Sequence, residues 1–137
     1  MKRLHMTKRC WMAAALLALA VGLFAGCGRS GLRIGWTEMT GLDRKRCTYR
    51  YFSGREIQRF RADAGETVAF DYEAEVTKGS LAIRIEGPDD VEVWQARLDA
   101  DDEGVFEFTA ETSGRYTVVV LGDETGGGFE IEWDTGL

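Results

Sequence analysis

The sequence predicts an all-β fold, a single antiparallel β-sandwich of seven or eight strands. Apolar and polar residues alternate with a period of two from Cys47 onward, which is typical of strands with one buried face. Turn signals interrupt this alternation about every 8 to 12 residues. No segment of residues 46–137 shows convincing helical periodicity. Short strands separated by frequent turns favour a sandwich.

The first 26 residues have the features of an export signal. Four basic residues and no acidic ones lie in MKRLHMTKR, and the uncharged run WMAAALLALAVGLFA follows from Trp11 to Ala25. A membrane-spanning helix needs roughly 20 apolar residues, and this run of 15 is shorter. We therefore expect residues 1–26 to be cleaved as a signal peptide.

The signal ends in LFAGC, which resembles the lipobox of bacterial lipoproteins. Ala25, Gly26 and Cys27 match, while Phe24 stands where the family usually has Leu. The resemblance implies that Cys27 becomes the lipid-bearing N-terminus of an extracytoplasmic protein anchored to the cell membrane. A thiolate is a suitable nucleophile for taking up the lipid, and small neighbours allow close approach. The alternative is an ordinary secretory signal in which Cys27 has no role.

The segment after the signal mixes Gly, Ser, Thr and charged residues. We expect residues 27–45 to comprise the lipidated Cys27 and a tether, in which Leu32, Ile34 and Trp36 alternate as a short edge strand would. The remaining residues 46–137, about 90 in number, suffice for one small core without disulfides. They are predicted to form the sandwich domain.

Within that domain each strand is predicted from its alternation. TVAFDYEAEV places apolar residues on one face and Asp71, Glu73 and Glu75 on the other. RYTVVVLG carries apolar residues on both faces, which predicts a strand in the centre of a sheet. VEVWQARLDA is also assigned as a strand. The predicted inward residues are Val68, Phe70, Tyr72, Ala74, Val76, Leu81, Ile83, Ile85, Phe106, Phe108, Ala110, Tyr116, Val118, Val120, Phe129, Ile131 and Trp133.

The last strands, GVFEFTAETSGRYTVVVLGDETGGGFEIEW, are similar to the small sandwiches of bacterial pre-peptidase C-terminal domains and of Golgi-dynamics (GOLD) domains. The matching features are structural, with Gly114 in a tight turn and Tyr116 in the core. The resemblance implies a module for adhesion, ligand binding or accessory work and carries over no binding residue.

The composition excludes several functions. His5 is the only histidine and lies in the signal, so the mature chain lacks the histidine of Ser-His-Asp and Cys-His catalysis and of histidine zinc sites. Cleavage leaves 13 of the 17 basic residues against 23 acidic ones, a net charge of −10, which makes nucleic acid an unsuitable partner. Cys47, the one thiol left besides Cys27, is interpreted as a small core residue, the alternative being a reactive or intermolecular thiol.

Two sets of acidic residues are candidates for chemical sites. The loop LDADDEGVF places Asp99, Asp101, Asp102 and Glu103 before a glycine, which suits a calcium loop, but the EF-hand pattern is absent and a solvated turn is favoured. A glycosidase would need two carboxylates in one cleft. The outward carboxylates of the strands are instead explained by strand patterning.

A basic set and an aromatic set of side chains are candidates for a surface role. The basic set could contact anionic headgroups, but cross-strand pairing with acidic strands is favoured. The aromatic set could form a platform for a carbohydrate or a peptide, although such rings more often belong to the core. The basic set is Arg44, Lys45, Arg46, Arg50, Arg55, Arg59 and Arg61, and the aromatic set is Trp36, Tyr49, Tyr51 and Trp94.

The sequence therefore predicts a membrane-anchored extracytoplasmic lipoprotein that acts as a non-catalytic binding or accessory module of the cell envelope. Expected partners are membrane lipid through acylated Cys27 and an envelope protein or glycan, and no cofactor, metal or catalytic residue is expected. The alternatives are a structural envelope protein without a dedicated small ligand and, more distantly, a carboxylate-dependent hydrolase. The sequence does not identify ligand-binding residues.

Overall fold

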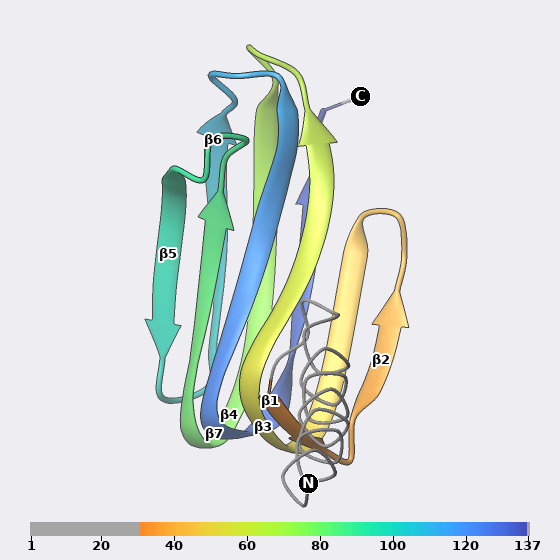
Figure 1. Cartoon of the computed structure of the whole chain (residues 1–137), viewed down its shortest axis with the longest axis vertical. Coiled ribbons are helices and arrows are strands. Elements are labelled where there is room, and N and C mark those ends of the chain that lie inside the picture. Colours follow the sequence, from red (N-terminus) through yellow and green to blue (C-terminus); the bar gives the residue numbers. More distant parts are fainter. Residues whose placement is uncertain (1–30, 137) are drawn as a thin grey trace, which may run out of the picture.

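The computed structural model describes residues 31–136, and these form seven antiparallel strands (Figure 1). The predicted all-β class is thereby confirmed. Within residues 31–136, no helix is long and apolar enough to span a membrane. The strands are β1 (Gly31–Ile34), β2 (Thr37–Thr40), β3 (Arg44–Ala62), β4 (Thr67–Glu86), β5 (Glu92–Leu98), β6 (Asp102–Thr109) and β7 (Gly114–Asp134).

Three long strands, β3, β4 and β7, each turn back at the same end of the molecule and so contribute to both layers of a sandwich (Figure 1). The first part of β4 pairs with β6 and its last part with β5. β7 pairs with β3 on one side and β4 on the other along nearly its whole length. The register shifts where the strands bend, at residues 49–54 of β3 and 76–80 of β4.

The pairing defines two layers with five strand segments each. The first layer contains β2, the start of β3, the end of β7, the start of β4, and β6. The second layer contains β1, the end of β3, the start of β7, the end of β4, and β5. Because β7 lies between β3 and β4 in both layers, its predicted central position is confirmed.

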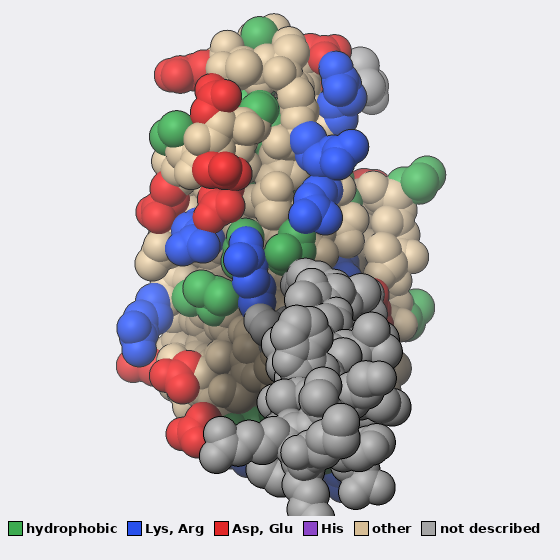
Figure 2. All heavy atoms as spheres, in the orientation of Figure 1, with side chains coloured by type: hydrophobic (Ala, Val, Ile, Leu, Met, Phe, Trp, Pro, Cys, Tyr) green, Lys and Arg blue, Asp and Glu red, His purple; other side chains and the backbone are tan. Residues whose placement is uncertain are grey.

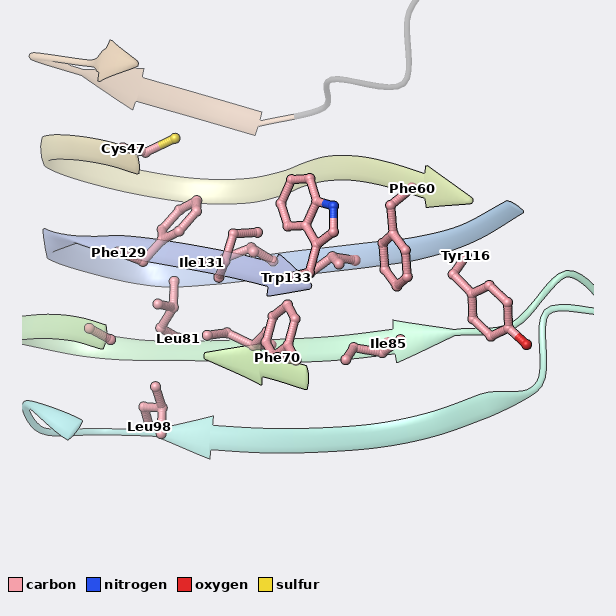
Figure 3. Close-up of a cluster of buried hydrophobic side chains, with 14 of the residues drawn as sticks. Cys47, Phe60, Phe70, Leu81, Ile85, Leu98, Tyr116, Phe129, Ile131 and Trp133 are labelled. Carbon is pink, nitrogen blue, oxygen red and sulfur yellow. The ribbon is translucent and has the colours of Figure 1, made fainter. Parts of the chain in front are cut away.

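The predicted inward residues form the core between the layers (Figure 3). Phe70, Ile83, Ile85 and Ile131 are fully buried, and Trp133 stacks on Phe60 at a centroid distance of 5.8 Å. Tyr72, Phe106 and Phe108 are only half-buried. These three lie near the side of the sandwich bounded by β5 and β6, where neither strand has a further neighbour.

The expected turns have two different structures. GPDD is a tight turn, in which the Asp90 amide donates to the Gly87 carbonyl at 3.0 Å. Pro88 stands at its second position, as its fixed φ favours. In contrast, TKGS and GDETGGG lie at the bends of β4 and β7 and do not separate two strands.

Residues 31–45, for which the sequence predicts a tether, contain two strands. The alternation of Leu32 and Ile34 does form an edge strand, β1, which pairs with residues 51–54 of β3. A second edge strand, β2, pairs with residues 45–48 of β3. The sandwich therefore includes strands that precede residue 46, where the sequence predicts its start.

Candidate functional site

The structure describes only one of the two cysteines singled out in the sequence. Cys27, the predicted lipid site, lies outside the described residues, as does the whole predicted signal. Cys47 is a free thiol with no exposed surface, so its predicted place in the core is confirmed. Burial raises the pKa of the Cys47 thiol to about 12. The thiolate needed for a reactive role is therefore scarce at neutral pH.

A buried group of charged side chains, which the sequence did not predict, lies at the β1–β2 side of the sandwich. Its members are Arg33, Glu38, Lys45 and Glu56, and we call it the edge ion cluster. Lys45 Nζ donates to Glu56 Oε1 and lies 3.1 Å from Glu38 Oε1, and Arg33 Nη1 lies 2.6 Å from Glu56 Oε2. The side chains of Lys45 and Glu56 are 3% and 2% exposed.

The edge ion cluster joins the two layers. Lys45 belongs to the part of β3 beside β2, whereas Glu56 belongs to the part that pairs with the start of β7 in the other layer. Burial alone would raise the pKa of Glu38, but hydrogen bonds from Lys45, Trp36 and Thr40 lower it below its usual value. Each of the four charged groups has an oppositely charged partner within the cluster, so we assign them to the stability of the fold rather than to ligand binding.

Three of the four aromatic candidates lie on β3 or pack beside it. Tyr49 is buried, and Trp36 stacks on it at 5.5 Å while the Arg33 guanidinium lies 4.2 Å from the centroid of the Trp36 ring. Tyr51 is half-buried, with Lys78 Nζ 5.4 Å from its ring. The fourth candidate, Trp94, packs against the core at the β5–β6 side. On this side two half-buried aromatic rings, Phe106 and Phe108, line an open cleft.

That cleft, which we call the edge cleft, has a volume of about 460 Å³ and lies where the start of β5 faces the end of β6. A row of rings runs along it: Trp94 stacks on Phe106 at 5.3 Å, Phe106 on Phe108 at 6.0 Å, and Phe108 contacts Tyr116 at 5.6 Å. Phe106, Phe108 and Tyr116 belong to its lining. The alternation of VFEF predicts that both Phe residues point inward, but it does not predict that an open cleft lies between the two layers at this edge.

Polar groups surround these rings. Asp89 and Glu92 come from the turn before β5 and from β5 itself, and Glu111 and Thr112 come from the loop after β6. The Tyr116 hydroxyl donates to the Thr112 carbonyl at 2.8 Å, which fixes the ring and leaves the hydroxyl oxygen able to accept. The edge cleft thus combines aromatic walls with acceptors at its rim, the composition of many small-ligand sites.

The outer face of the first layer is acidic. A shallow groove of about 460 Å³ is lined there by Asp71, Glu73, Glu103, Glu130 and Glu132, among others. Arg44 Nη2 lies 2.9 Å from Glu132 Oε2, and Arg46 Nε lies 3.2 Å from Glu130 Oε2. The favoured cross-strand pairing is therefore confirmed for these two arginines.

The acidic loop before β6 makes hydrogen bonds to β4. Asp101 Oδ1 accepts from the Val76 amide at 2.8 Å, and Asp102 Oδ2 accepts from the Tyr72 hydroxyl at 3.1 Å. Among the residues that the structure describes, no group of three or more His, Cys, Asp or Glu is arranged to hold a metal ion. The loop carboxylates thus tie the β5–β6 connection to β4.

Comparison with known proteins identifies no relative by sequence, because no family model and no curated protein matches the chain. Solved structures with similar folds include TmCBM61 in complex with β-1,4-galactotriose (14% identity, TM-score 0.48, covering 77% of this chain and 83% of that one). Others are a CBM4 structure (13%, 0.46, 81% and 78%) and the pre-peptidase C-terminal domain of a collagenase from Bacillus anthracis (13%, 0.45, 77% and 89%). The strand pairing shows that the chain is a small β-sandwich, and these solved structures are what it is similar to.

Proposed function

We propose that the protein is an extracytoplasmic lipoprotein, held to the membrane by a lipid on Cys27, whose sandwich binds a neutral oligosaccharide in the edge cleft. The observation that carries the ligand proposal is the row of half-buried rings at an open cleft with carboxylates at its rim. The anchor proposal is supported by the sequence LFAGC alone.

The chemistry of the edge cleft favours a sugar. The apolar C–H face of a pyranose ring packs well on an aromatic ring, and Phe106 and Phe108 are only half-buried. Sugar hydroxyls are donors that suit the carboxylates of Glu92 and Glu111. The same carboxylates repel anionic ligands, so neutral saccharides are preferred.

Binding without catalysis is the better account of this site. The mature chain has no histidine, and the acidic groove of the first layer is an open sheet face on which arginines already pair with two of the carboxylates. The hydrolase alternative therefore has little support. A structural envelope role remains the nearest rival and predicts that the edge cleft binds no saccharide.

Replacing Phe106 by Leu is expected to weaken oligosaccharide binding roughly 10-fold, since it keeps an apolar side chain but removes the aromatic face. Isothermal titration against neutral oligosaccharides selected on a glycan array measures the effect. Val105→Ala is the matched control, because Val105 is 76% exposed and points to the outer face of the same strand. The ligand proposal fails if no neutral oligosaccharide binds the wild type, or if Phe106→Leu binds as tightly as the control.

Mass spectrometry of the N-terminal peptide tests the anchor. The wild-type peptide is expected to begin at Cys27 and to carry a diacylglyceryl group, which Cys27→Ala abolishes. Cys10→Ala serves as the control, since Cys10 lies in the predicted signal and its loss should leave lipidation intact. An unlipidated wild-type peptide, or lipid on the Cys27→Ala chain, would contradict the proposal.

A further inference from the structure

The outer face of the second layer carries most of the arginines. Six of the ten arginines in residues 31–136 lie on it, and we call it the arginine face. Figure 2 shows basic side chains running down the β3 side of this face and acidic ones gathered towards the β5 side. The six are Arg55, Arg59, Arg61, Arg84, Arg97 and Arg115.

The strand register places these arginines next to one another. Arg61 pairs with Arg115, and Arg59 with Thr117, across β3 and β7. Ala82, two residues from Arg84, pairs with Arg97 across β4 and β5. Arg59, Arg61, Arg97 and Arg115 are exposed, and none of these four has an ion pair within 4.0 Å to a described residue.

Apolar residues fill the middle of the arginine face. Ile57 pairs with Val119 and Arg55 with Leu121, so an apolar strip of Ile57, Leu121 and the fully covered Val119 crosses β3 and β7 between the arginines. Ile57 and Leu121 are half-buried. The carboxylates at outward positions of the described strands here include Asp123, near the bend of β7, and Glu86 and Glu92, which pair with each other at the other end of β4 and β5. Glu86 Oε1 lies 2.8 Å from Arg84 Nε.

The two outer faces of the sandwich therefore differ in charge. The acidic residues of the first layer, such as Glu73 and Glu130, lie on the far side of a sandwich whose layers are about 10 Å apart. This spacing exceeds the Debye length of about 8 Å at physiological ionic strength, so the acids are largely screened from a partner on the arginine face. The net charge of −10 in the mature chain does not prevent this face from attracting anions.

We propose that the arginine face docks on the anionic phospholipid headgroups of the membrane, an inference that rests on attachment at Cys27. Arginines bind phosphates through paired N–H donors, and the apolar strip suits the headgroup boundary.

The position of the first strand supports this occupant. Three residues lie between Cys27 and Gly31, so the two Cα atoms are four steps along the chain and at most about 14 Å apart. Gly31 pairs with Gly54, the residue before Arg55. A lipid on Cys27 would thus hold the edge of the arginine face close to the bilayer.

Vesicle binding by the unlipidated mature chain, residues 27–137 with Cys27→Ser, tests this docking apart from the anchor. This chain keeps all seven strands and the whole described core, and cooperative unfolding is checked first. It is expected to float with phosphatidylcholine vesicles that contain phosphatidylglycerol and not with vesicles of phosphatidylcholine alone. Binding should weaken as salt is added.

The variant Arg59→Gln/Arg61→Gln/Arg115→Gln is expected to lower the partition coefficient on the order of 100-fold, because each arginine near an anionic surface contributes about 1 kcal/mol. The control Arg44→Gln/Arg46→Gln/Arg50→Gln removes the same charge from the start of β3, on the outer face of the other layer. Failure of the starting chain to bind anionic vesicles, or equal losses in the two variants, overturns the proposal. Either result would contradict the docking proposal alone, because lipidation of Cys27 and oligosaccharide binding are measured separately.

Discussion

Glu56→Ala is expected to lower the free energy of unfolding by about 3 to 5 kcal/mol, since it removes one of the two carboxylates that pair with buried Lys45 and the one that pairs with Arg33 in the described structure. Lys45, 3% exposed, donates to Glu56, and Arg33 lies 2.6 Å from the other carboxylate oxygen. With Glu56 removed, Lys45 retains Glu38 at 3.1 Å as its one remaining carboxylate in the described structure. Urea unfolding at neutral pH measures the loss as a lower midpoint at unchanged slope.

Two further variants separate the charge effect from general damage. Glu73→Ala removes a carboxylate from an exposed position of β4 and should change stability by no more than about 0.5 kcal/mol. Lys45→Met/Glu56→Leu replaces the pair by apolar residues and should recover most of the stability, because a buried ion pair is often worth no more than well-packed apolar groups. If the double variant loses as much free energy of unfolding as Lys45→Met and Glu56→Leu lose in sum, the two residues are not coupled.

The edge ion cluster also explains why the start of the sandwich could not be predicted. Lys45 and Glu56 occupy inward positions of β3, where the alternation rule expects apolar residues. Their burial depends on each other and on Arg33, which lies 23 residues before Glu56 in sequence. No local pattern contains that information, so the segment before residue 46 had the composition of a tether.

The core was predictable because it depends on local alternation. The inward positions of β4 and β7, such as Phe70 and Ile131, were identified from the sequence and are buried. The path of the strands was not predictable, since TKGS resembles a hairpin turn but lies inside one continuous strand. The edge cleft could not be predicted for the same reason. The alternation places Phe106 inward correctly, but whether a ring at the rim of a sandwich is covered depends on how far apart β5 and β6 lie.

Gly127→Ala is expected to lower the free energy of unfolding by roughly 4 kcal/mol or more, because it affects the bend that carries β7 from one layer to the other. Gly127 has φ of 119°, which L-residues rarely adopt. A Cβ atom there would also collide with the backbone carbonyl of Glu75 on the neighbouring strand β4. That carbonyl cannot move away without disturbing the pairing of β4 with β7 around Val76 and Gly127.

Gly65→Ala separates the collision from the backbone strain. Gly65 has φ of 90°, also in the region that disfavours a side chain, but its Cβ would meet no atom within 4 Å. Strain alone should cost about 1 to 3 kcal/mol, so Gly65→Ala is expected to retain a measurable two-state transition. Urea unfolding monitored by circular dichroism compares the two variants. If Gly127→Ala loses no more free energy of unfolding than Gly65→Ala, then β4 moves away at the bend to make room for the Cβ atom. Close contact between β4 and β7 would then not stabilise the crossing between layers.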